Sequence, residues 1–527
     1  MATSYWILLC AGTLAGIALA PATRWLAHRA NLVDRPDGRR KVDGRVTPLG
    51  GGIAVYATAL AVMFALLAFP SPWQSALVAD SGRLLALGVG CTLLLTVGLI
   101  DDRFELRGRH KLLAQILVCI MLAASGFTIQ RVELFGESVS LGVLAAPLSV
   151  LWLLSAINAL NLIDGMDGLA TGVGLTMMAA ILPLALMLGH TSDAVLAVAF
   201  AGAMIGFLCY NFPPAQQFLG DAGSMLIGLV LGALSLFNSS DEPNTVRILL
   251  PLAIWTIPAL DVAAAIVRRK LTGRSIYNTD RAHLHHCMLA RLGTPRRTLA
   301  VVAACSLLNA AGAVASKYWN NDWFAAASCL SAVAFLVAMR LFGHSEALLL
   351  ASRIKSFALS LSHPFTLSDA EQATAIQLQG TRQWGLLWES LTQFADKLNL
   401  LSIQLNVNLP AMQEGYHATW RRPQEYNPER VWRTEIPLFA GSHSVGRLTI
   451  AGFHDGQSAC ELIERLMDLL QPYEALLLEM ARVDPPHATA THAALRPLEP
   501  GEPRRTDEGQ IEAASPHGAA LPGTPVG

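Results

Sequence analysis

Long apolar stretches recur from the amino terminus to about Leu341, each close to the roughly 20 residues that a helix needs to cross a bilayer. We count eleven, of which the eighth is short and rich in glycine. They run approximately over Tyr5–Ala20, Gly52–Phe69, Leu84–Ile100, Leu112–Phe127, Leu141–Ile157, Leu169–Leu188, Ala194–Phe212, Met225–Phe237, Val246–Val267, Leu299–Val314 and Trp323–Leu341. The pattern predicts an all-α polytopic membrane bundle of about eleven transmembrane helices.

Basic residues are divided unevenly between the loops that join these stretches. Loops on one side carry most of the Lys and Arg, within residues 24–45, 103–111 and 268–297, whereas the opposite loops carry only Arg131 and Lys317, with Arg83 and Arg247 at span edges. Because Lys and Arg in short loops stay in the cytoplasm, we expect the amino terminus outside. An odd number of spans then places the carboxy-terminal region in the cytoplasm.

The pattern changes after about residue 342. An amphipathic stretch at Leu348–Leu361 is followed by a predicted helix at Trp384–Leu398, predicted strands at Leu401–Val407, Val431–Phe439 and Val445–Ala451, and a closing helix at Ala459–Leu478. The last residues are rich in Pro, Ala and Gly, which is typical of disorder. We therefore expect a transmembrane domain at 1–342, a small cytoplasmic α+β module at 343–483 and a disordered tail at 484–527.

Composition supports a membrane protein and excludes other classes. The 53% of hydrophobic residues and 15% of charged residues contrast with about 25% charged residues in ordinary soluble proteins. A net charge of -1 without a basic block gives no reason to expect a nucleic-acid partner. The eight cysteines are scattered, without a CxxC pair, and predict no disulfide framework.

More than half of the carboxylates of the first 300 residues fall at the predicted cytoplasmic ends of the spans, where acids are costly and therefore functional candidates. The candidate polar residues form five clusters, which contain Asp34 and Asp37; Asp101 and Asp102; Asn158, Asn161, Asp164 and Asp167; Asp221; and Asp280, His283, His285 and His286. A single Asp of this kind is often a helix cap. Acids that converge from five segments repel one another unless a cation lies between them, and oxygen ligands suit Mg²⁺ or Mn²⁺.

Basic residues near the same clusters predict an anionic substrate. They include Arg39, Arg40, Lys41, Arg109 and Lys111. A metal ion and cations around a phosphate are the requirements of phosphoryl transfer. The three histidines have no second spaced set of ligands, so we interpret them as contacts to a substrate phosphate or sugar rather than as a zinc site.

These residues resemble the polyprenyl-phosphate N-acetylhexosamine-1-phosphate transferase family (glycosyltransferase family 4). The resemblance covers approximately Leu32 to Arg291 and rests on Asp101-Asp102, on the motif from Asn158 to Ala170, on Phe218 to Ser224 and on Asp280 to His286. The form of the histidine motif and the number of spans are closest to the undecaprenyl-phosphate GlcNAc-1-phosphate transferases. The first loop departs from the family, because Asp43 stands where a His is common.

The resemblance implies a bacterial inner-membrane enzyme that transfers GlcNAc 1-phosphate from UDP-GlcNAc to undecaprenyl phosphate, releasing UMP and initiating a cell-envelope polysaccharide. It implies Asn161, Asp221 and Asp102 at a magnesium ion, and catalytic roles for Asp101, Asp102, Asp164 and Asp167. The implied substrate contacts are Asp34, Arg40, Lys41, Lys111, Asn158, His283, His285 and His286. The lipid bilayer and the two substrates are the implied partners, and a homodimer is left open.

Other interpretations remain at the level of sequence. The donor can be another UDP-N-acetylhexosamine, including UDP-MurNAc-pentapeptide, and the transfer can be direct or proceed through a phospho-aspartate. A transporter is a different class of explanation, but carriers place polar groups near the midplane and usually show two similar halves. A membrane-anchored sensor would leave the aspartate clusters unexplained.

Overall fold

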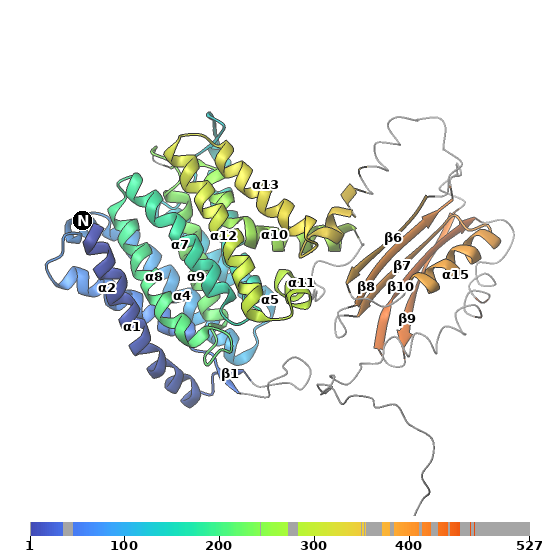
Figure 1. Ribbon diagram of the computed structural model, residues 1–527, viewed down its shortest axis with the longest axis horizontal. Coiled ribbons are helices and arrows are strands. Elements are labelled where there is room, and N and C mark those ends of the chain that lie inside the picture. The colour runs from blue at the N-terminus through green and yellow to red at the C-terminus, as the bar shows by residue number, and fades with distance from the viewer. Residues whose placement is uncertain are drawn as a thin grey trace, which may run out of the picture. The chain divides into compact units, whose positions relative to one another are not determined.

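The computed structural model describes residues 2–34, 46–242, 244–271, 283–348, 350–351, 354, 372–379, 384–409, 414–422, 431–440, 443–453, 464 and 468. Its first part is helical (Figure 1). The helices are α1 (Ala2–Arg29), α2 (Gly51–Ala68), α3 (Gln74–Ala79), α4 (Ser81–Phe104), α5 (Gly108–Ala124), α6 (Ala145–Ile163), α7 (Leu169–Met187), α8 (Thr191–Asn211), α9 (Gly220–Phe237), α10 (Leu249–Leu271), α11 (Leu284–Leu292), α12 (Pro295–Tyr318) and α13 (Trp323–Ala338).

Every one of the eleven predicted apolar stretches coincides with one of these helices. Within the described residues, nine helices are long and apolar enough to cross a membrane, which confirms a polytopic membrane protein. Helices α5 and α13 have 17 and 16 residues and fall short of that length. The count of eleven spans therefore stays a prediction.

Helix α9 is the central helix of this part. Every residue from Ala222 to Leu236 is buried, as expected for a helix that is apolar on all sides. It contacts α2, α4, α6, α7 and α10. The predicted span began at Met225, but the helix begins at Gly220, so Asp221 lies in its first turn.

The closest approach to α9 is made by α4. A Cβ atom at Gly98 would lie 2.2 Å from the Cα of Ala222, so only glycine fits at this crossing. Because Gly98 is one turn before Asp102, the contact brings the end of α4 against the beginning of α9. The sequence Gly98 to Asp102 thus positions a pair of acids beside Asp221.

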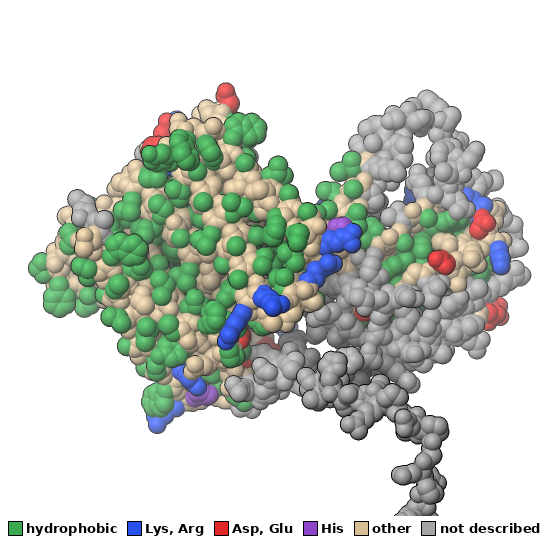
Figure 2. Space-filling model, in the orientation of Figure 1, with side chains coloured by type: hydrophobic (Ala, Val, Ile, Leu, Met, Phe, Trp, Pro, Cys, Tyr) green, Lys and Arg blue, Asp and Glu red, His purple; other side chains and the backbone are tan. Residues whose placement is uncertain are grey.

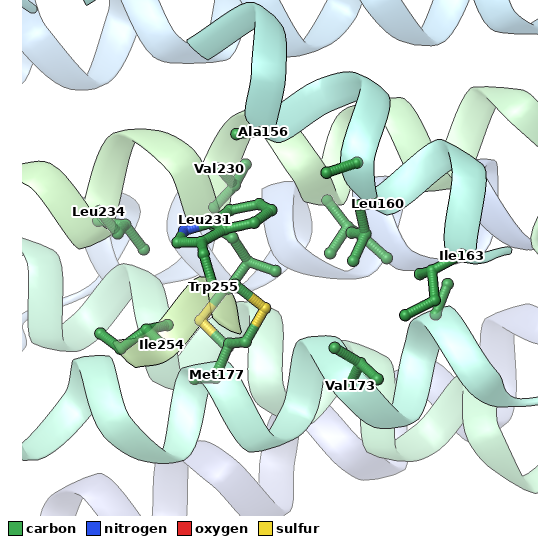
Figure 3. Close-up of a cluster of buried hydrophobic side chains, with 14 of the residues drawn as sticks. Ala156, Leu160, Ile163, Val173, Met177, Val230, Leu231, Leu234, Ile254 and Trp255 are labelled. Atoms are coloured by element: carbon green, nitrogen blue, oxygen red, sulfur yellow. The ribbon is translucent and has the colours of Figure 1, made fainter. Parts of the chain in front are cut away.

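The core around α9 is built from branched and long apolar side chains (Figure 3). Leu160 and Ile163 of α6, Val173 and Met177 of α7 and Trp255 of α10 converge there and are all buried. In a soluble protein, burying a side chain of this size stabilises the folded state by about 1.5–3 kcal/mol. In a bilayer, close packing supplies much of the attraction between helices. This rigid core holds the helix ends that carry the polar clusters.

Short strands lie at both ends of the bundle. Strands β1 (Val33–Asp34) and β2 (Thr47–Pro48) form an antiparallel pair before α2. Strands β3 (Arg131–Leu134), β4 (Glu137–Ser140) and β5 (Thr245–Arg247) form a three-stranded sheet in the order β4-β3-β5. Because β5 follows α9, this second sheet lies at the end of the bundle opposite Asp221. Neither sheet was predicted, since each strand has four residues or fewer.

The surface of the helical part supports a bilayer environment. Figure 2 shows hydrophobic side chains over most of its visible face, with Lys and Arg side chains along the lower edge. Large side chains such as Phe64, Leu85 and Leu330 are exposed. An exposed apolar surface of this extent faces lipid rather than water.

The later part of the chain contains a five-stranded antiparallel sheet in the order β6-β8-β7-β10-β9. Its strands are β6 (Gln372–Gln379), β7 (Ser402–Leu409), β8 (Glu414–Arg421), β9 (Val431–Ala440) and β10 (His443–Phe453), and helix α15 (Trp384–Lys397) packs against β7 and β8. Trp384 and Leu391 of α15 are buried in one cluster with Leu405 of β7. The predicted helix and three strands coincide with α15, β7, β9 and β10.

Strands β6 and β8 were not predicted, although Tyr416, Ala418 and Trp420 of β8 alternate with polar residues. The tail at 484–527 lies outside the described residues, as do most of Leu348–Leu361 and most of the predicted helix at Ala459–Leu478, of which Glu464 and Asp468 are described and helical. The domain boundaries at 342 and 483 and the cytoplasmic location of this part stay predictions.

Candidate active site

A pocket of about 440 Å³ opens where the ends of α4, α6 and α9 meet. Six carboxylates line it, and none of the described residues that line it is Lys or Arg. The acids are Asp34, Asp102, Glu105, Asp164, Asp167 and Asp221. Carboxylates gathered in this way raise one another's free energy unless a cation compensates them.

Asp102 is held by the first turn of α9. Its Oδ1 accepts a hydrogen bond from the backbone N–H of Asp221 at 2.9 Å, and its Oδ2 accepts one from Ala222 at 3.3 Å. The carboxylate therefore satisfies N–H groups that have no partner within the helix and lies at the positive end of the helix dipole. Asp102 fixes α4 to α9 at the pocket wall.

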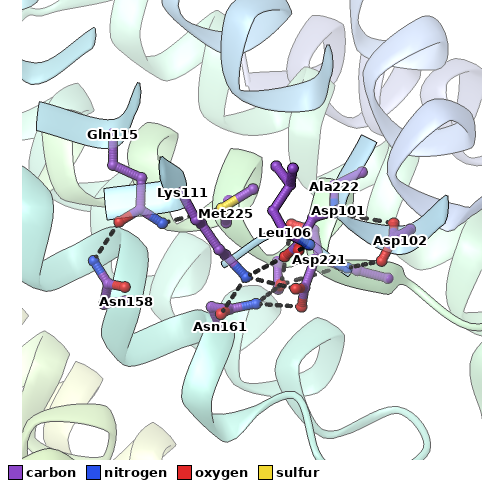
Figure 4. Close-up of polar contacts among 12 residues, drawn as sticks. Asp101, Asp102, Leu106, Lys111, Gln115, Asn158, Asn161, Asp221, Ala222 and Met225 are labelled. Carbon is purple, nitrogen blue, oxygen red and sulfur yellow. Dashed lines mark hydrogen bonds and ion pairs between the residues drawn. The ribbon is translucent and has the colours of Figure 1, made fainter. Parts of the chain in front are cut away.

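Lys111 connects the neighbouring acids (Figure 4). Its ammonium group pairs with Asp101 at 2.9 Å and with Asp221, and donates to the amide oxygen of Asn161 at 3.2 Å. Asn161 in turn donates to Asp221 Oδ1 at 2.7 Å. A cation thus lies among three oxygen-bearing side chains from α4, α6 and α9. Asp221 is the more open of the two acids that pair with Lys111, with 37% of its side chain exposed against 10% for Asp101.

Asp164 and Asp167 follow the end of α6, where the helix gives way to the Asp-Gly-Met-Asp-Gly turn. Asp167 Oδ2 accepts a hydrogen bond from the backbone N–H of Ala215 at 2.9 Å. No hydrogen bond or ion pair reaches the carboxylate of Asp164 from the described residues. Burial, followed by repulsion from Asp221 and Asp102, raises the pKa of Asp164 well above its ordinary value. Asp164 is thus the acid that most needs a cation.

The histidines lie on α11, next to the same turn. A Cβ atom at Gly165 would lie 2.2 Å from Nε2 of His285, so the glycine lets the imidazole approach the backbone beside Asp164. The rings of His283 and His285 are nearly parallel, with centroids 6.3 Å apart, and His286 lies 4.1 Å from His285. Burial, then the neighbouring His286 and His283, lowers the pKa of His285 to about 3, so this ring is neutral at pH 7.

Most predicted site residues come together, but not all. Asp34 lines the pocket from β1. Asn158 lies one turn before Asn161 and donates to Gln115 at 2.8 Å, away from the pocket lining. The loop with Arg40 and Lys41 lies outside the described residues.

Two acids of this region were missed by the sequence reasoning. Glu105 lines the pocket just after Asp101-Asp102, and its φ of 50° ends α4 in a left-handed turn. Asp261 lies fully buried in the middle of a predicted span, next to His283. The signal for Asp261 was present, because an isolated acid within an apolar span is a functional candidate by default.

The donor chemistry of the pocket suits a hard divalent cation. Carboxylate and amide oxygens are the groups that bind Mg²⁺, and a bound cation would favour the ionised form of Asp164, which burial and the neighbouring acids disfavour. In the described part of the chain, no three His, Cys, Asp or Glu side chains already stand together as a ready-made metal site. The predicted set nevertheless lies together, since Asn161 contacts Asp221 and the Asp221 backbone contacts Asp102.

The fold and this pocket define a polytopic membrane protein with an acidic site at one end of its helices. Residues 84–239 match the family model for glycosyl transferase family 4. This segment contains Asp101, Asp102, Asn161, Asp164 and Asp221, and therefore most of the site.

Relatives extend the similarity over most of the helical part. A Bacillus subtilis (strain 168) protein named probable undecaprenyl-phosphate N-acetylglucosaminyl 1-phosphate transferase is 31% identical over 303 residues, which is 57% of this chain and 82% of the relative. A decaprenyl-phosphate N-acetylglucosaminephosphotransferase of Mycolicibacterium smegmatis is 34% identical, over 59% of this chain and 82% of the relative. An undecaprenyl-phosphate alpha-N-acetylglucosaminyl 1-phosphate transferase of Escherichia coli (strain K12) is 29% identical, over 61% of this chain and 85% of the relative.

The chain therefore belongs to glycosyl transferase family 4, among the polyprenyl-phosphate N-acetylhexosamine-1-phosphate transferases.

Proposed function

We propose that this protein transfers N-acetylglucosamine 1-phosphate from UDP-GlcNAc to undecaprenyl phosphate, giving undecaprenyl-diphosphate-GlcNAc and UMP. The observation that carries the proposal is the acidic pocket with Lys111 at its edge, built from the segment that matches the family. The names of the relatives supply the sugar and the type of lipid. The product initiates a cell-envelope polysaccharide.

The reaction is a direct displacement. A phosphate oxygen of the lipid attacks the sugar-linked phosphorus of UDP-GlcNAc, the bond from this phosphorus to the bridging oxygen breaks, and UMP leaves with the electron pair. The protein's task is then to position two anions and to neutralise their charge. Lys111 provides one fixed positive charge beside Asp221.

The contacts of each acid suggest its role in the reaction. Asp102 is committed to the first turn of α9, and Asp101 to Lys111 and to the backbone N–H of Leu106. Asp221 and Asp164 keep oxygens that face the pocket. Asp101 and Asp102 therefore orient the acceptor side of the site, while Asp164 and Asp167 position the nucleotide or support catalysis.

Mg²⁺ is the proposed cofactor, with Mn²⁺ as an alternative. Asn161, Asp221 and Asp102 would hold it. A bound divalent ion supplies charge neutralisation on the diphosphate. The loop with Arg40 and Lys41, together with His283, His285 and His286, is proposed to contact the donor's phosphates and sugar.

The membrane arrangement completes the proposal. We place the protein in the bacterial inner membrane with eleven spans, the amino terminus outside, and the pocket and the later part of the chain in the cytoplasm. The bias of Lys and Arg between the two sets of loops supports this orientation. A cytoplasmic pocket has access to UDP-sugars.

The test is transfer of label from tritiated UDP-GlcNAc to undecaprenyl phosphate by the purified full-length protein. We expect labelled lipid in Mg²⁺, none in EDTA, and a loss of about 100-fold or more in Asp221→Asn, because one essential electrostatic contact is worth that much. Asp193→Asn is the matched control. Asp193 is equally an aspartate on a spanning helix, but it is bonded to Arg83 and Asn238 outside the acidic pocket.

Two outcomes contradict the proposal in different ways. Transfer from another UDP-N-acetylhexosamine, with none from UDP-GlcNAc, would correct the donor and keep the reaction. Folded protein that forms no labelled lipid from any UDP-sugar would overturn the proposed reaction.

A further inference from the structure

Asp261 is a buried acid to which the reaction proposed above gives no role. It lies near the middle of α10 and has no exposed surface. Burying a carboxylate is costly unless hydrogen bonds or a charge compensate it. The cost indicates that Asp261 contributes something that an apolar residue at this position cannot.

The contacts of Asp261 are all with the beginning of α11. Its Oδ1 accepts a hydrogen bond from the backbone N–H of Leu284 at 2.9 Å and lies 3.3 Å from Nδ1 of His283. Its Oδ2 has no hydrogen-bond partner among the described residues. One carboxylate thus caps the histidine helix and faces its first histidine.

The position of α11 determines where the other histidines lie. His285 is on the same helix, its ring is nearly parallel to that of His283, and it fills the space left by the missing side chain of Gly165. Any shift of α11 along α10 would move His285 away from the turn that carries Asp164. Asp261 is a polar contact that fixes this register from α10.

We propose that Asp261 is a positioning residue that acts through His283. It holds α11 against the Asp164–Gly165 turn and orients the imidazole of His283 for the donor substrate. This inference rests on the proposed transfer reaction for its kinetic part and on geometry alone for its structural part.

The effect of Asp261 on His283 depends on which ring nitrogen faces the carboxylate, and this nitrogen is Nδ1. A carboxylate beside Nδ1 favours hydrogen on that nitrogen and fixes the ring plane. The second ring nitrogen, Nε2, then has a defined direction. A histidine of this kind presents Nε2 to a phosphate or hydroxyl of the donor in one orientation rather than several.

Two substitutions separate this role from simple helix capping. Asp261→Asn keeps a side-chain oxygen that can accept the hydrogen bond from the backbone N–H of Leu284, but it removes the negative charge beside His283. Asp261→Ala removes both the oxygen that accepts from Leu284 and the negative charge beside His283. If Asp261 were only a cap, the Asn variant would behave like the wild type.

The experiment combines hydrogen–deuterium exchange of residues 284–292 with steady-state transfer kinetics on the full-length protein. We expect Asp261→Ala to accelerate exchange in α11 and Asp261→Asn to leave it unchanged. We expect both to lower kcat/KM for UDP-GlcNAc by about 10- to 100-fold, as loss of such outer partners does elsewhere. Asp193→Asn, another buried aspartate, is expected to keep wild-type exchange in α11 and wild-type kcat/KM.

A double-mutant cycle tests whether the effect passes through His283. Asp261→Asn combined with His283→Gln should be no worse than His283→Gln alone, because coupled residues are not additive. The proposal would be overturned if the losses of kcat/KM in Asp261→Asn and His283→Gln multiplied in the double variant, or if Asp261→Asn kept the wild-type kcat/KM. Unchanged exchange in Asp261→Ala would also overturn it, even if the wild-type protein transferred no label and the proposed reaction itself had failed.

Discussion

Replacing Lys111 by Met removes the cation that lies among Asp101, Asp221 and Asn161. The Lys111–Asp101 pair at 2.9 Å corresponds to an attraction of about 6 kcal/mol at an effective dielectric constant near 20. Desolvation cancels part of it, and breaking a fully buried pair costs about 3–5 kcal/mol. Solvent reaches these side chains, which are 15%, 10% and 37% exposed for Lys111, Asp101 and Asp221, so we expect a net loss of about 1–3 kcal/mol.

The assay is thermal unfolding in detergent with EDTA or with Mg²⁺. A loss of this size should lower Tm by roughly 3–8 °C in EDTA. Mg²⁺ should raise the Tm of Lys111→Met more than that of the wild type, because the divalent ion replaces the missing ammonium among the same oxygens. Transfer activity in Mg²⁺ should fall sharply.

Lys317→Met is the matched control for this substitution. Lys317 pairs with Asp241, which is largely exposed, and surface pairs contribute at most about 1 kcal/mol. A Lys111→Met protein that melts like the wild type in EDTA, or that gains no more from Mg²⁺, would refute the view that Lys111 compensates the converging acids.

Three further substitutions test separate parts of the structure. Gly98→Ala should destabilise the protein by about 1–3 kcal/mol and lower transfer, because the added methyl group meets the backbone at Ala222; equal Tm values would contradict this. Asp164→Asn should abolish transfer yet raise Tm in EDTA at pH 7. The raised pKa of Asp164 in the folded state means that stability is lost as the pH rises from the ordinary carboxyl pKa, so the gain should vanish near pH 4. Leu405→Ala should destabilise the five-stranded sheet by about 2–5 kcal/mol, measured by limited proteolysis, and leave transfer unchanged; a parallel loss of transfer would show that the two parts are coupled.

The helices were predictable from sequence because each apolar stretch is long enough to show against its polar loops. The acids were predictable for the same reason, since a carboxylate beside a span has few structural explanations. Strands β3 to β5 were not, because three or four residues give too few alternations to recognise. Length does not explain why β6 and β8 were missed, because each has eight residues, and in β8 Tyr416, Ala418 and Trp420 alternate with polar residues.

The contacts between the acidic residues could not be predicted from the sequence. Asp102 and Asp221 are 119 residues apart, and their contact depends on Gly98 allowing α4 to reach α9. Asp261 was visible in the sequence as an isolated acid within a span, but its partner, the beginning of α11, was not, because that segment is not part of an apolar span. Short helices between spans carry no hydrophobic pattern of their own, so their position has to come from the structure.

The length of α9 has a consequence for the lipid environment of the enzyme. Its 18 residues span about 27 Å, slightly less than the roughly 30 Å hydrocarbon core of a typical bilayer. Because α9 is buried, lipid meets its neighbour α2, which has the same 18 residues and an exposed Phe64, and a thicker bilayer would have to thin locally around α2 or draw the acidic pocket below the headgroups. Turnover should therefore depend on acyl-chain length, with an optimum in membranes whose thickness matches this central helix.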